Sequence, residues 1–259
     1  MLPIRLLFLS LCAAMALSAG PAWADAREDF IAGTSMQCPG CDLHGANLKR
    51  HVMTGANLAG ANLTGASLHD AKLNGANLKG ANLTGANLNK ADLSRADLSG
   101  ANLTSALLYA SRLELTNLTG ATLDKVRMAT ARLTRANLSG ASIRDADLRN
   151  TAMAEAKFIG ADLTNTWLDF AHLRAADMSG AKLDQAGLGR AELAGTNLTG
   201  ASLVRANAQD ADLREADLTD ADVTRATFWK ADMFGTVLTG TKFSETVMPD
   251  GALRAAATP

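Results

Sequence analysis

The sequence predicts an all-β fold in which the chain winds into a four-sided parallel β-helix, and two periodicities predict it. Every fifth residue from Leu43 to Met248 is apolar, and a small residue, usually Ala, stands two positions before each of these centres. A second period of 20 appears at positions 40, 60, 80 and onward to 240, which are all Gly except Asp220. Repetition at a fixed period is typical of solenoid architectures.

The period of five fits neither standard element. On an α-helix five residues advance about 500°, so the apolar side chains would spiral around the helix. On a continuous strand an odd spacing would put alternate apolar residues on opposite faces. A short extended piece followed by a two-residue turn avoids both problems, because the small residue and the centre then point inward together. Each pentapeptide is therefore predicted to form one side of a coil.

The period of 20 predicts how many sides complete a coil. We interpret the glycine column as one corner that recurs once per coil and needs a residue without Cβ, as a turn with positive φ requires. Another corner carries larger residues such as Arg50 and Thr130. Four pentapeptides per coil follow. About ten coils at a spacing of about 4.8 Å would make a rod about 50 Å long.

The segment "GANLTGANLNKADLSRADLSGANL", residues 80–103, resembles the pentapeptide-repeat family. The resemblance covers residues 41–248 and implies a right-handed quadrilateral β-helix with the centre and the small residue packed inside. It says little about function, because the repeated residues encode core packing. Hydrophobic residues make up 47% of the chain and aromatic residues only 4%, which agrees with one narrow core and no large pocket. We expect a single solenoid domain.

Residues 1–24 are predicted to be a secretory signal peptide that is cleaved after Ala24. Arg5 precedes an apolar run over residues 6–17, and Ala22-Trp23-Ala24 matches the pattern that signal peptidase cuts. The apolar run is too short to span a membrane. Leu11, directly before Cys12, is too large for lipoprotein processing. We therefore expect a periplasmic or secreted protein without a membrane span.

Short segments flank the predicted solenoid. Residues 25–40 are expected to form an N-terminal cap with one or two helical turns, in which Phe30 and Ile31 cover the first coil, because a solenoid needs closed ends. At the other end, the turn-forming residues 249–251, Pro-Asp-Gly, are expected to stop the repeat. Residues 249–259 are then a C-terminal tail.

Cys38 and Cys41 form a CPGC motif at the start of the repeat. By repeat phase both thiols face the first coil, and an oxidising compartment favours a structural disulfide between them. A thiol-disulfide exchange site is the alternative, although the sequence lacks the alternating strands and helices of thioredoxin-like proteins. Haem attachment is excluded because Asp42, not His, follows Cys41.

Cys38, Cys41, His44 and His51 also have the residue types of a zinc site. The repeat phase points His44 outward and puts His51 two sides away, so the four side chains are not expected to converge. We therefore predict no metal site and no other cofactor. We also predict no enzyme, because no nucleophile, base and orienting group can be proposed together and no phosphate-binding loop is present.

One side of the predicted coils carries the most apolar group of outward residues. Laid out by the period of 20, that side holds Leu107, Tyr109, Arg127, Arg149, Trp167 and Phe170. Gly187 and Gly189 follow on the next coil and leave a bare step beside Trp167. Exposed aromatic residues flanked by Arg are typical of recognition surfaces. We predict a partner-binding site here, and chance placement on a tolerant solenoid face is the alternative.

These features predict an exported, non-enzymatic scaffold that binds a protein partner or has a structural role. A periplasmic thiol-redox or sensor protein that uses the CPGC pair is the alternative. Some pentapeptide-repeat proteins resemble B-DNA in outline and act on DNA gyrase, but such mimicry needs a strongly acidic surface. This chain has 25 Lys plus Arg against 26 Asp plus Glu, with both signs interspersed. DNA mimicry and nucleic-acid binding are therefore not favoured, while the partner's identity and the choice between monomer and homodimer stay open.

Overall fold

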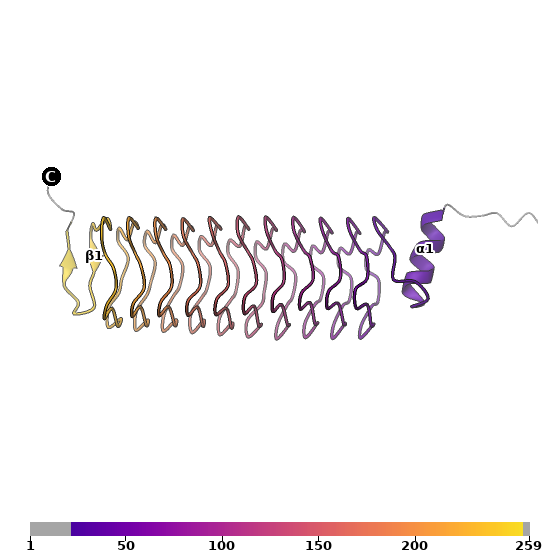
Figure 1. The fold of residues 1–259 in the computed structure, drawn as a ribbon, viewed down its shortest axis with the longest axis horizontal. Helices are drawn as coiled ribbons and strands as arrows, with labels where there is room; N and C mark the ends of the chain where they lie inside the picture. The colour runs from indigo at the N-terminus through magenta and orange to yellow at the C-terminus, as the bar shows by residue number, and fades with distance from the viewer. Residues whose placement is uncertain (1–21, 256–259) are drawn as a thin grey trace, which may run out of the picture.

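The computed structural model describes residues 22–255 and shows a rod of stacked coils (Figure 1). The helix α1, Ala22–Ile31, lies at the N-terminal end of the rod. At the C-terminal end β1, Thr246–Val247, pairs antiparallel with β2, Leu253–Arg254. The predicted signal peptide lies outside the described residues up to position 21, and α1 begins ahead of the predicted cleavage position after Ala24.

Each coil consists of four pentapeptides, as the period of 20 predicts. The outward residue before each centre forms a parallel bridge with the residue 20 positions later, beginning at Gln37. The Asn137 amide donates to the Thr116 carbonyl at 2.9 Å, and the Leu138 amide donates to the Lys157 carbonyl at 2.7 Å. The backbone of one coil is thus hydrogen-bonded to the coils on both sides, which holds the rod together along its axis.

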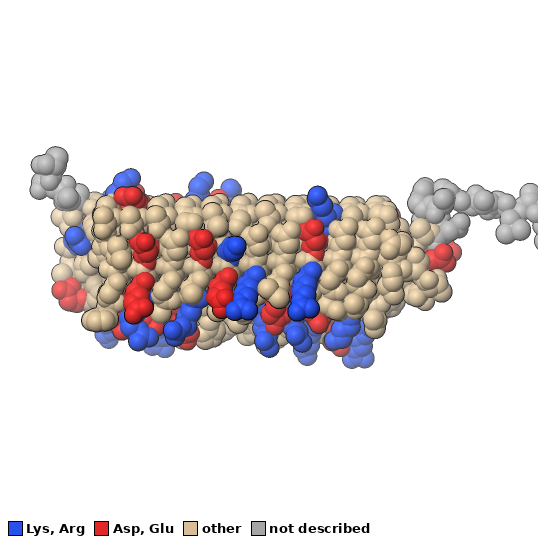
Figure 2. Space-filling model, in the orientation of Figure 1, with Lys and Arg blue, Asp and Glu red and all other residues tan. Residues whose placement is uncertain are grey.

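The outward positions carry charges of both signs. Figure 2 shows Lys and Arg side chains interspersed with Asp and Glu along one edge of the rod. Several ion pairs join neighbouring coils: Arg135 Nε lies 2.8 Å from Glu155 Oε2, and Arg225 Nε lies 3.0 Å from Glu245 Oε2. Charges of both signs are therefore interspersed on the rod, and some of them pair between neighbouring coils.

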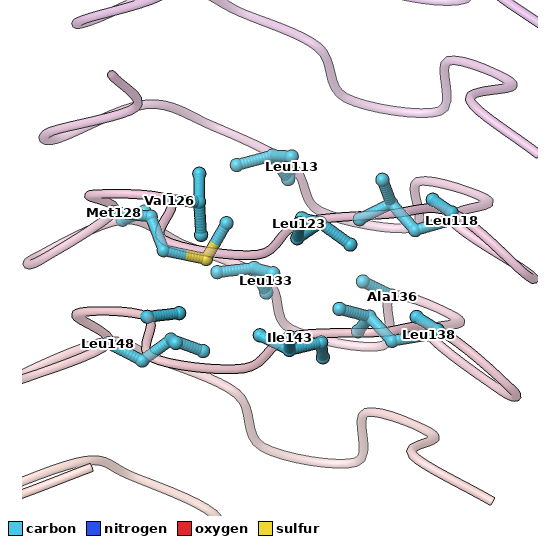
Figure 3. Close-up of a cluster of buried hydrophobic side chains, with 14 of the residues drawn as sticks. Leu113, Leu118, Leu123, Val126, Met128, Leu133, Ala136, Leu138, Ile143 and Leu148 are labelled. Atoms are coloured by element: carbon cyan, nitrogen blue, oxygen red, sulfur yellow. The ribbon is translucent and has the colours of Figure 1, made fainter. Parts of the chain in front are cut away.

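The core is a narrow column of stacked side chains (Figure 3). The centres and the small residues two positions before them are buried, and Leu138 has no exposed surface. At most inward positions where Thr replaces Ala, the Thr hydroxyl donates to the carbonyl of a centre one coil earlier, as from Thr116 to Leu93 at 2.9 Å, whereas the Thr151 hydroxyl donates to the Leu148 carbonyl of its own coil at 2.6 Å. No buried side-chain nitrogen or oxygen in the described part of the chain lacks a hydrogen-bond partner. Packing thus fills the interior, and function must lie on the outer surface.

Every corner, not only the glycine column, has a positive φ. The Ala141 amide donates to the Leu138 carbonyl at 3.0 Å, and Gly140 at the third position of this turn has a φ of 65°. This arrangement is typical of a type II turn. At two other corners Thr130 has a φ of 61° and Gly65 a φ of 63°. The prediction that a single column of corners needs positive φ is therefore wrong, because all four turns of a coil bend the chain in the same way.

Steric contact does not explain the glycine column either. From Gly40 to Gly200, a Cβ atom in that column would meet no heavy atom within 4 Å, and the same is true of Gly65 at another corner; only Gly240, in the last coil, would meet a side chain, that of Asp220. The number of sides per coil is correct, but the physical reason inferred for it is not.

Helix α1 covers the N-terminal end of the core. Phe30 is buried in the core, and Ile31 packs against it. Arg27 Nε donates to the Asp42 carbonyl at 2.8 Å, and His51 Nε2 lies 3.2 Å from the Ile31 carbonyl. Apolar contact and hydrogen bonds together join the helix to the first coil.

The C-terminal end of the described chain has a smaller cover. The Met248 amide donates to the Ala252 carbonyl at 2.8 Å around the turn at 249–251, and β2 pairs with β1 on one side of the last coil. Three centres of that coil are only partly buried: Met233, Leu238 and Phe243. The last coil therefore leaves part of its core exposed.

Candidate functional site

All six predicted site residues lie on one side of the rod, which we call the aromatic side. This side comprises residues 107–110, 127–130, 147–150, 167–170, 187–190, 207–210 and 227–230. One ladder of bridges connects Leu107, Arg127, Asp147, Trp167 and Gly187. Tyr109 and Arg149 lie in the turns that follow this ladder, and Phe170 lies at a corner. The residues form a row and not a compact cluster, because Tyr109 and Trp167 are three coils, or about 14 Å, apart.

The aromatic rings of this row are accessible. Tyr109 is 53%, Trp167 52% and Phe170 46% exposed. Both Arg residues are exposed as well, whereas Leu107 is half-buried. None of the three rings is part of the core, so a partner can contact them without disturbing the packing of the coils.

Arg149 holds Trp167 in place. Its Nε donates to Asp147 Oδ1 and its Nη2 to Asp147 Oδ2, both at 2.9 Å, and its Cζ lies 5.6 Å from the centroid of the Trp167 ring. The two-pronged contact fixes the guanidinium, and a cation over an indole ring is favourable. The hydrogen bonds from Arg149 lower the pKa of Asp147, and the same hydrogen bonds raise the pKa of Arg149. Trp167 therefore has a fixed guanidinium beside its ring.

A pocket with a volume of about 260 Å³ lies beside Phe170. Its lining consists of Asp169, Phe170, Gly189, Arg190, Asn207, Gln209 and Asp210. The Arg190 Cζ lies 5.7 Å from the centroid of the Phe170 ring, and the Arg190 Nε lies 3.8 Å from Asp210 Oδ2. The pocket thus combines an aromatic wall, backbone and side-chain polar groups, and charges of both signs.

Gly187 and Gly189 form a step beside this pocket and differ from the corner glycines. They occupy outward positions where another coil carries Asp147 and Arg149, and neither has a positive φ. A Cβ atom would lie 3.0 Å from Asp169 Oδ2 at Gly187 and 2.7 Å from Asp169 Oδ1 at Gly189. The Gly189 amide also donates to Asp169 Oδ1 at 3.1 Å. The surface at Gly187 and Gly189, which was predicted to be uncovered, is therefore covered in part by the Asp169 carboxylate, which contacts both glycines.

Several residues of the aromatic side were not predicted from the sequence. Trp229 is 41% exposed, and Lys230 Nζ lies 4.3 Å from the centroid of its ring. Trp229 and Tyr109 occupy the same turn position in different coils. The period of 20 in the sequence therefore predicts that Trp229 lies on the aromatic side. The roles of Asp169 and Arg190 have no such signal, because they depend on the directions in which the two side chains point.

The cysteine pair lies in the first coil, away from the aromatic side. The Sγ atoms of Cys38 and Cys41 are 2.09 Å apart, and both residues are buried. His44 is exposed, and His51 contacts α1. Nowhere in residues 22–255 do three or more His, Cys, Asp or Glu side chains gather as ligands for a metal ion. The predicted thiol pair is thus brought together, while the four candidate zinc ligands are not.

The fold and this surface define a β-helical repeat protein with an aromatic outer side. The model of the pentapeptide-repeat family matches the chain in eight copies. The matches span residues 40–150 and 156–248. The chain belongs to the pentapeptide-repeat family, and its coils stack as a parallel β-helix. Across the described residues, no helix has the length and apolar character needed to cross a membrane.

Solved structures of pentapeptide-repeat proteins are similar to the chain. HetL, which is involved in heterocyst differentiation regulation in the cyanobacterium Nostoc sp. strain PCC 7120, is 30% identical, with 89% of this chain and 98% of HetL covered and a TM-score of 0.37. A protein from the thylakoid lumen of Arabidopsis thaliana is also 30% identical, with 35% and 63% covered and a TM-score of 0.34. QnrB1, a plasmid-mediated fluoroquinolone resistance protein, is 19% identical, with 78% and 91% covered and a TM-score of 0.36. No curated protein matches. The function must therefore be argued from the outward residues of this chain.

Proposed function

We propose that this protein is an exported, non-enzymatic scaffold that binds a protein partner through its aromatic side. One observation carries the proposal: Tyr109, Trp167 and Trp229, which are the only Tyr and Trp residues of the repeat, are all exposed on this one side. Trp, Tyr and Arg contribute most of the binding energy at protein interfaces. Folding of the solenoid does not require these exposed residues to lie on one outer side.

The neighbours of the rings support a role in binding. Arg149 is fixed by Asp147 and lies over Trp167, and Arg190 lies over Phe170. Immobilising a side chain at an interface costs about 0.5–1.5 kcal/mol. Rings that are already held by cations lose less freedom on binding, so more of their contact energy remains as affinity.

The same surface argues against catalysis and against nucleic acid. The pocket beside Phe170, at about 260 Å³, is smaller than typical small-molecule sites of about 300–1,000 Å³. The aromatic side carries charges of both signs, because Arg149 pairs with Asp147 and Arg190 lies 3.8 Å from Asp210, whereas a nucleic-acid surface needs a basic stripe and a DNA mimic an acidic one. A protein partner is the class that an aromatic row with mixed charge fits.

Export and the cysteine pair belong to the same proposal. We place the mature protein in the periplasm or outside the cell, where an oxidising environment favours a Cys38–Cys41 disulfide in the first coil. The burial of both thiols supports a structural role, because thiol exchange needs an accessible sulfur. Titration of the mature native protein should find no free thiol. Thiols that cycle between the reduced and oxidised forms would instead favour the redox alternative.

A pair of variants tests the aromatic side. Trp167→Ala removes the central ring, and Ser139→Ala is the control on the opposite side, where the Ser139 hydroxyl donates only to Asn137 Oδ1 at 2.7 Å. The wild type and both variants are used as bait in extracts of the native compartment. The captured partner is then titrated against each of them.

Trp167→Ala is expected to weaken binding by about 2 kcal/mol, or about 30-fold, without changing the melting temperature. Ser139→Ala should bind like the wild type. Equal binding by all three proteins would overturn the assignment of the aromatic side, and a lower melting temperature of Trp167→Ala would show that the ring serves stability.

A further inference from the structure

We propose that the pocket beside Phe170 receives a basic side chain, Lys or Arg, from the protein partner. This inference rests on the proposed function and names the chemistry that the partner must present at the middle of the aromatic side. Its basis is the combination of Gly187 and Gly189, the Asp169 carboxylate and the Phe170 wall.

The fold does not require glycine at this step. Among the glycines of the described residues, only Gly187 and Gly189 lack a positive φ. A side chain at Gly189 would displace the Asp169 carboxylate, since its Cβ would lie 2.7 Å from Asp169 Oδ1, and would fill the floor of the pocket. Glycine at positions 187 and 189 therefore leaves the pocket unfilled and leaves room for the Asp169 carboxylate at its edge.

Asp169 gives the pocket a carboxylate that takes part in no salt bridge in the described part of the chain. Within the described residues, Arg149 is paired with Asp147 and Arg190 lies 3.8 Å from Asp210, whereas Asp169 has no cationic group within 4 Å. Asp169 Oδ1 accepts the Gly189 amide, and Asp169 Oδ2 has no hydrogen-bond partner in that part of the chain. An incoming ammonium or guanidinium group would pair with this free oxygen.

The pocket wall suits the stem of a long basic side chain. Lys and Arg bury their methylene groups along apolar surface while the charged head reaches a polar partner. The Phe170 ring supplies the apolar surface, and Arg190, whose Cζ lies 5.7 Å from the ring centroid, has Asp210 as its own carboxylate partner at 3.8 Å. An acidic side chain would be repelled by Asp169, and an apolar one would bury that carboxylate without a partner.

The test uses nuclear magnetic resonance on the 15N-labelled full-length mature chain with three blocked peptides. Acetyl-Gly-Arg-Gly-amide and acetyl-Gly-Lys-Gly-amide are the probes, and acetyl-Gly-Glu-Gly-amide is the control. The basic peptides are expected to give saturable shifts of the Gly189 and Gln209 amide signals in about the millimolar range, and the acidic peptide none. Equal shifts with all three peptides, or no shift with any, would overturn the proposal.

Asp169→Asn should weaken the basic peptides at least tenfold. The matched control is Asp184→Asn, because Asp184 Oδ1 accepts the Val204 amide at 3.1 Å on the neighbouring side in the manner of Asp169 and Gly189. Asp184→Asn should leave the shifts unchanged. Equal affinities of the wild type and Asp169→Asn for the basic peptides would contradict a role of this carboxylate.

The pocket and the proposed function fail in different experiments. If the partner needs Trp167 but binds Asp169→Asn as tightly as the wild type, the proposal for the pocket is wrong. The proposal that the aromatic side binds the partner is then still supported. Basic peptides that shift Gly189, combined with a partner that is indifferent to Trp167, would overturn the proposed function and keep the pocket as a site for basic side chains.

Discussion

A corner residue of this solenoid adopts a left-handed backbone whatever side chain it carries. Gly120 has a φ of 63°, Thr130 of 61° and Phe170 of 60°. A left-handed backbone costs an L-residue with a Cβ atom about 1–2 kcal/mol. The hydrogen bonds between coils hold each corner in this conformation and offset that strain. Large residues such as Phe170 can therefore occupy a corner and be exposed there.

Two glycines at different corners should be equally sensitive to substitution. Gly120→Ala and Gly65→Ala are each expected to destabilise the protein by about 1–2 kcal/mol, because φ is 63° at both and a Cβ atom has open space at both. The reverse change, Thr130→Gly, should stabilise by up to about 1 kcal/mol, since it relieves a β-branched residue at positive φ. Denaturant midpoints measure all three, and a loss confined to Gly120 would restore a special role for the glycine column.

The coil is the element of this fold, and its stability depends on what covers it. An inner coil has neighbours on both sides, α1 covers the first coil, and the last coil leaves Met233, Leu238 and Phe243 partly exposed. Each repeat of a solenoid contacts only its neighbours, so stability is a sum of local terms. The same substitution should therefore have different effects at different coils.

Leu138 and Leu238 occupy the same position in an inner coil and in the last coil. Leu138→Ala is expected to destabilise by about 2–5 kcal/mol, because it leaves a cavity between two covering coils. Leu238→Ala should cost less, since its side chain is already partly in water. Ser139→Ala, which loses one hydrogen bond at the surface, should cost under about 1.5 kcal/mol. Chemical denaturation compares the three, and a silent Leu138→Ala would contradict the assignment of inward positions.

Phe30→Ala tests whether α1 acts as a cap. The ring is buried against the first coil, so its loss should cost about 3–5 kcal/mol locally. Hydrogen exchange is expected to speed up at the Leu43 and Leu48 amides and to stay unchanged at the Leu138 amide. Uniform acceleration along the rod would show that the coils unfold as one unit and not from the end.

Carboxyl groups along the whole rod make the stability of the fold depend on pH. The pKa of Asp147 is lowered by hydrogen bonds from Arg149, and the pKa of Asp212 by hydrogen bonds from Arg214. Other carboxyl groups with lowered pKa values are Asp92, Glu155, Asp162, Asp217 and Glu245. A group with a folded pKa below its unfolded pKa stabilises the fold above the unfolded value, and this contribution is lost as the pH falls through the folded pKa.

The melting temperature should therefore fall progressively below about pH 5, where the unfolded carboxyl groups begin to bind protons. Asp147→Asn removes one of these groups and should make the acid decrease shallower than in the wild type. Ser139→Ala, which changes no charge, should keep the full decrease. Identical acid profiles of Asp147→Asn and the wild type would contradict a lowered pKa of Asp147.

The sequence by itself determined the coil, its core and the side on which the candidate site lies. Whether Leu138 points inward depends on spacing within one pentapeptide, and whether Trp167 shares a side with Leu107 depends on a period of 20 that runs without interruption. Both are properties of the chain's own spacing. The conformation of the corners was not predictable from the glycine column, because hydrogen bonds between coils impose a positive φ on Thr130 as firmly as on Gly120.

Only the tertiary structure decided how side chains on neighbouring coils meet. The contact of Arg149 with Trp167, the position of Arg190 over Phe170 and the lean of Asp169 over Gly189 all join residues of different coils or turns. Spacing places such residues within reach of one another, but the rotamers of long side chains and the competition among neighbouring charges select which contacts form. The row of aromatic residues was therefore visible in the sequence, and the pocket beside Phe170 was not.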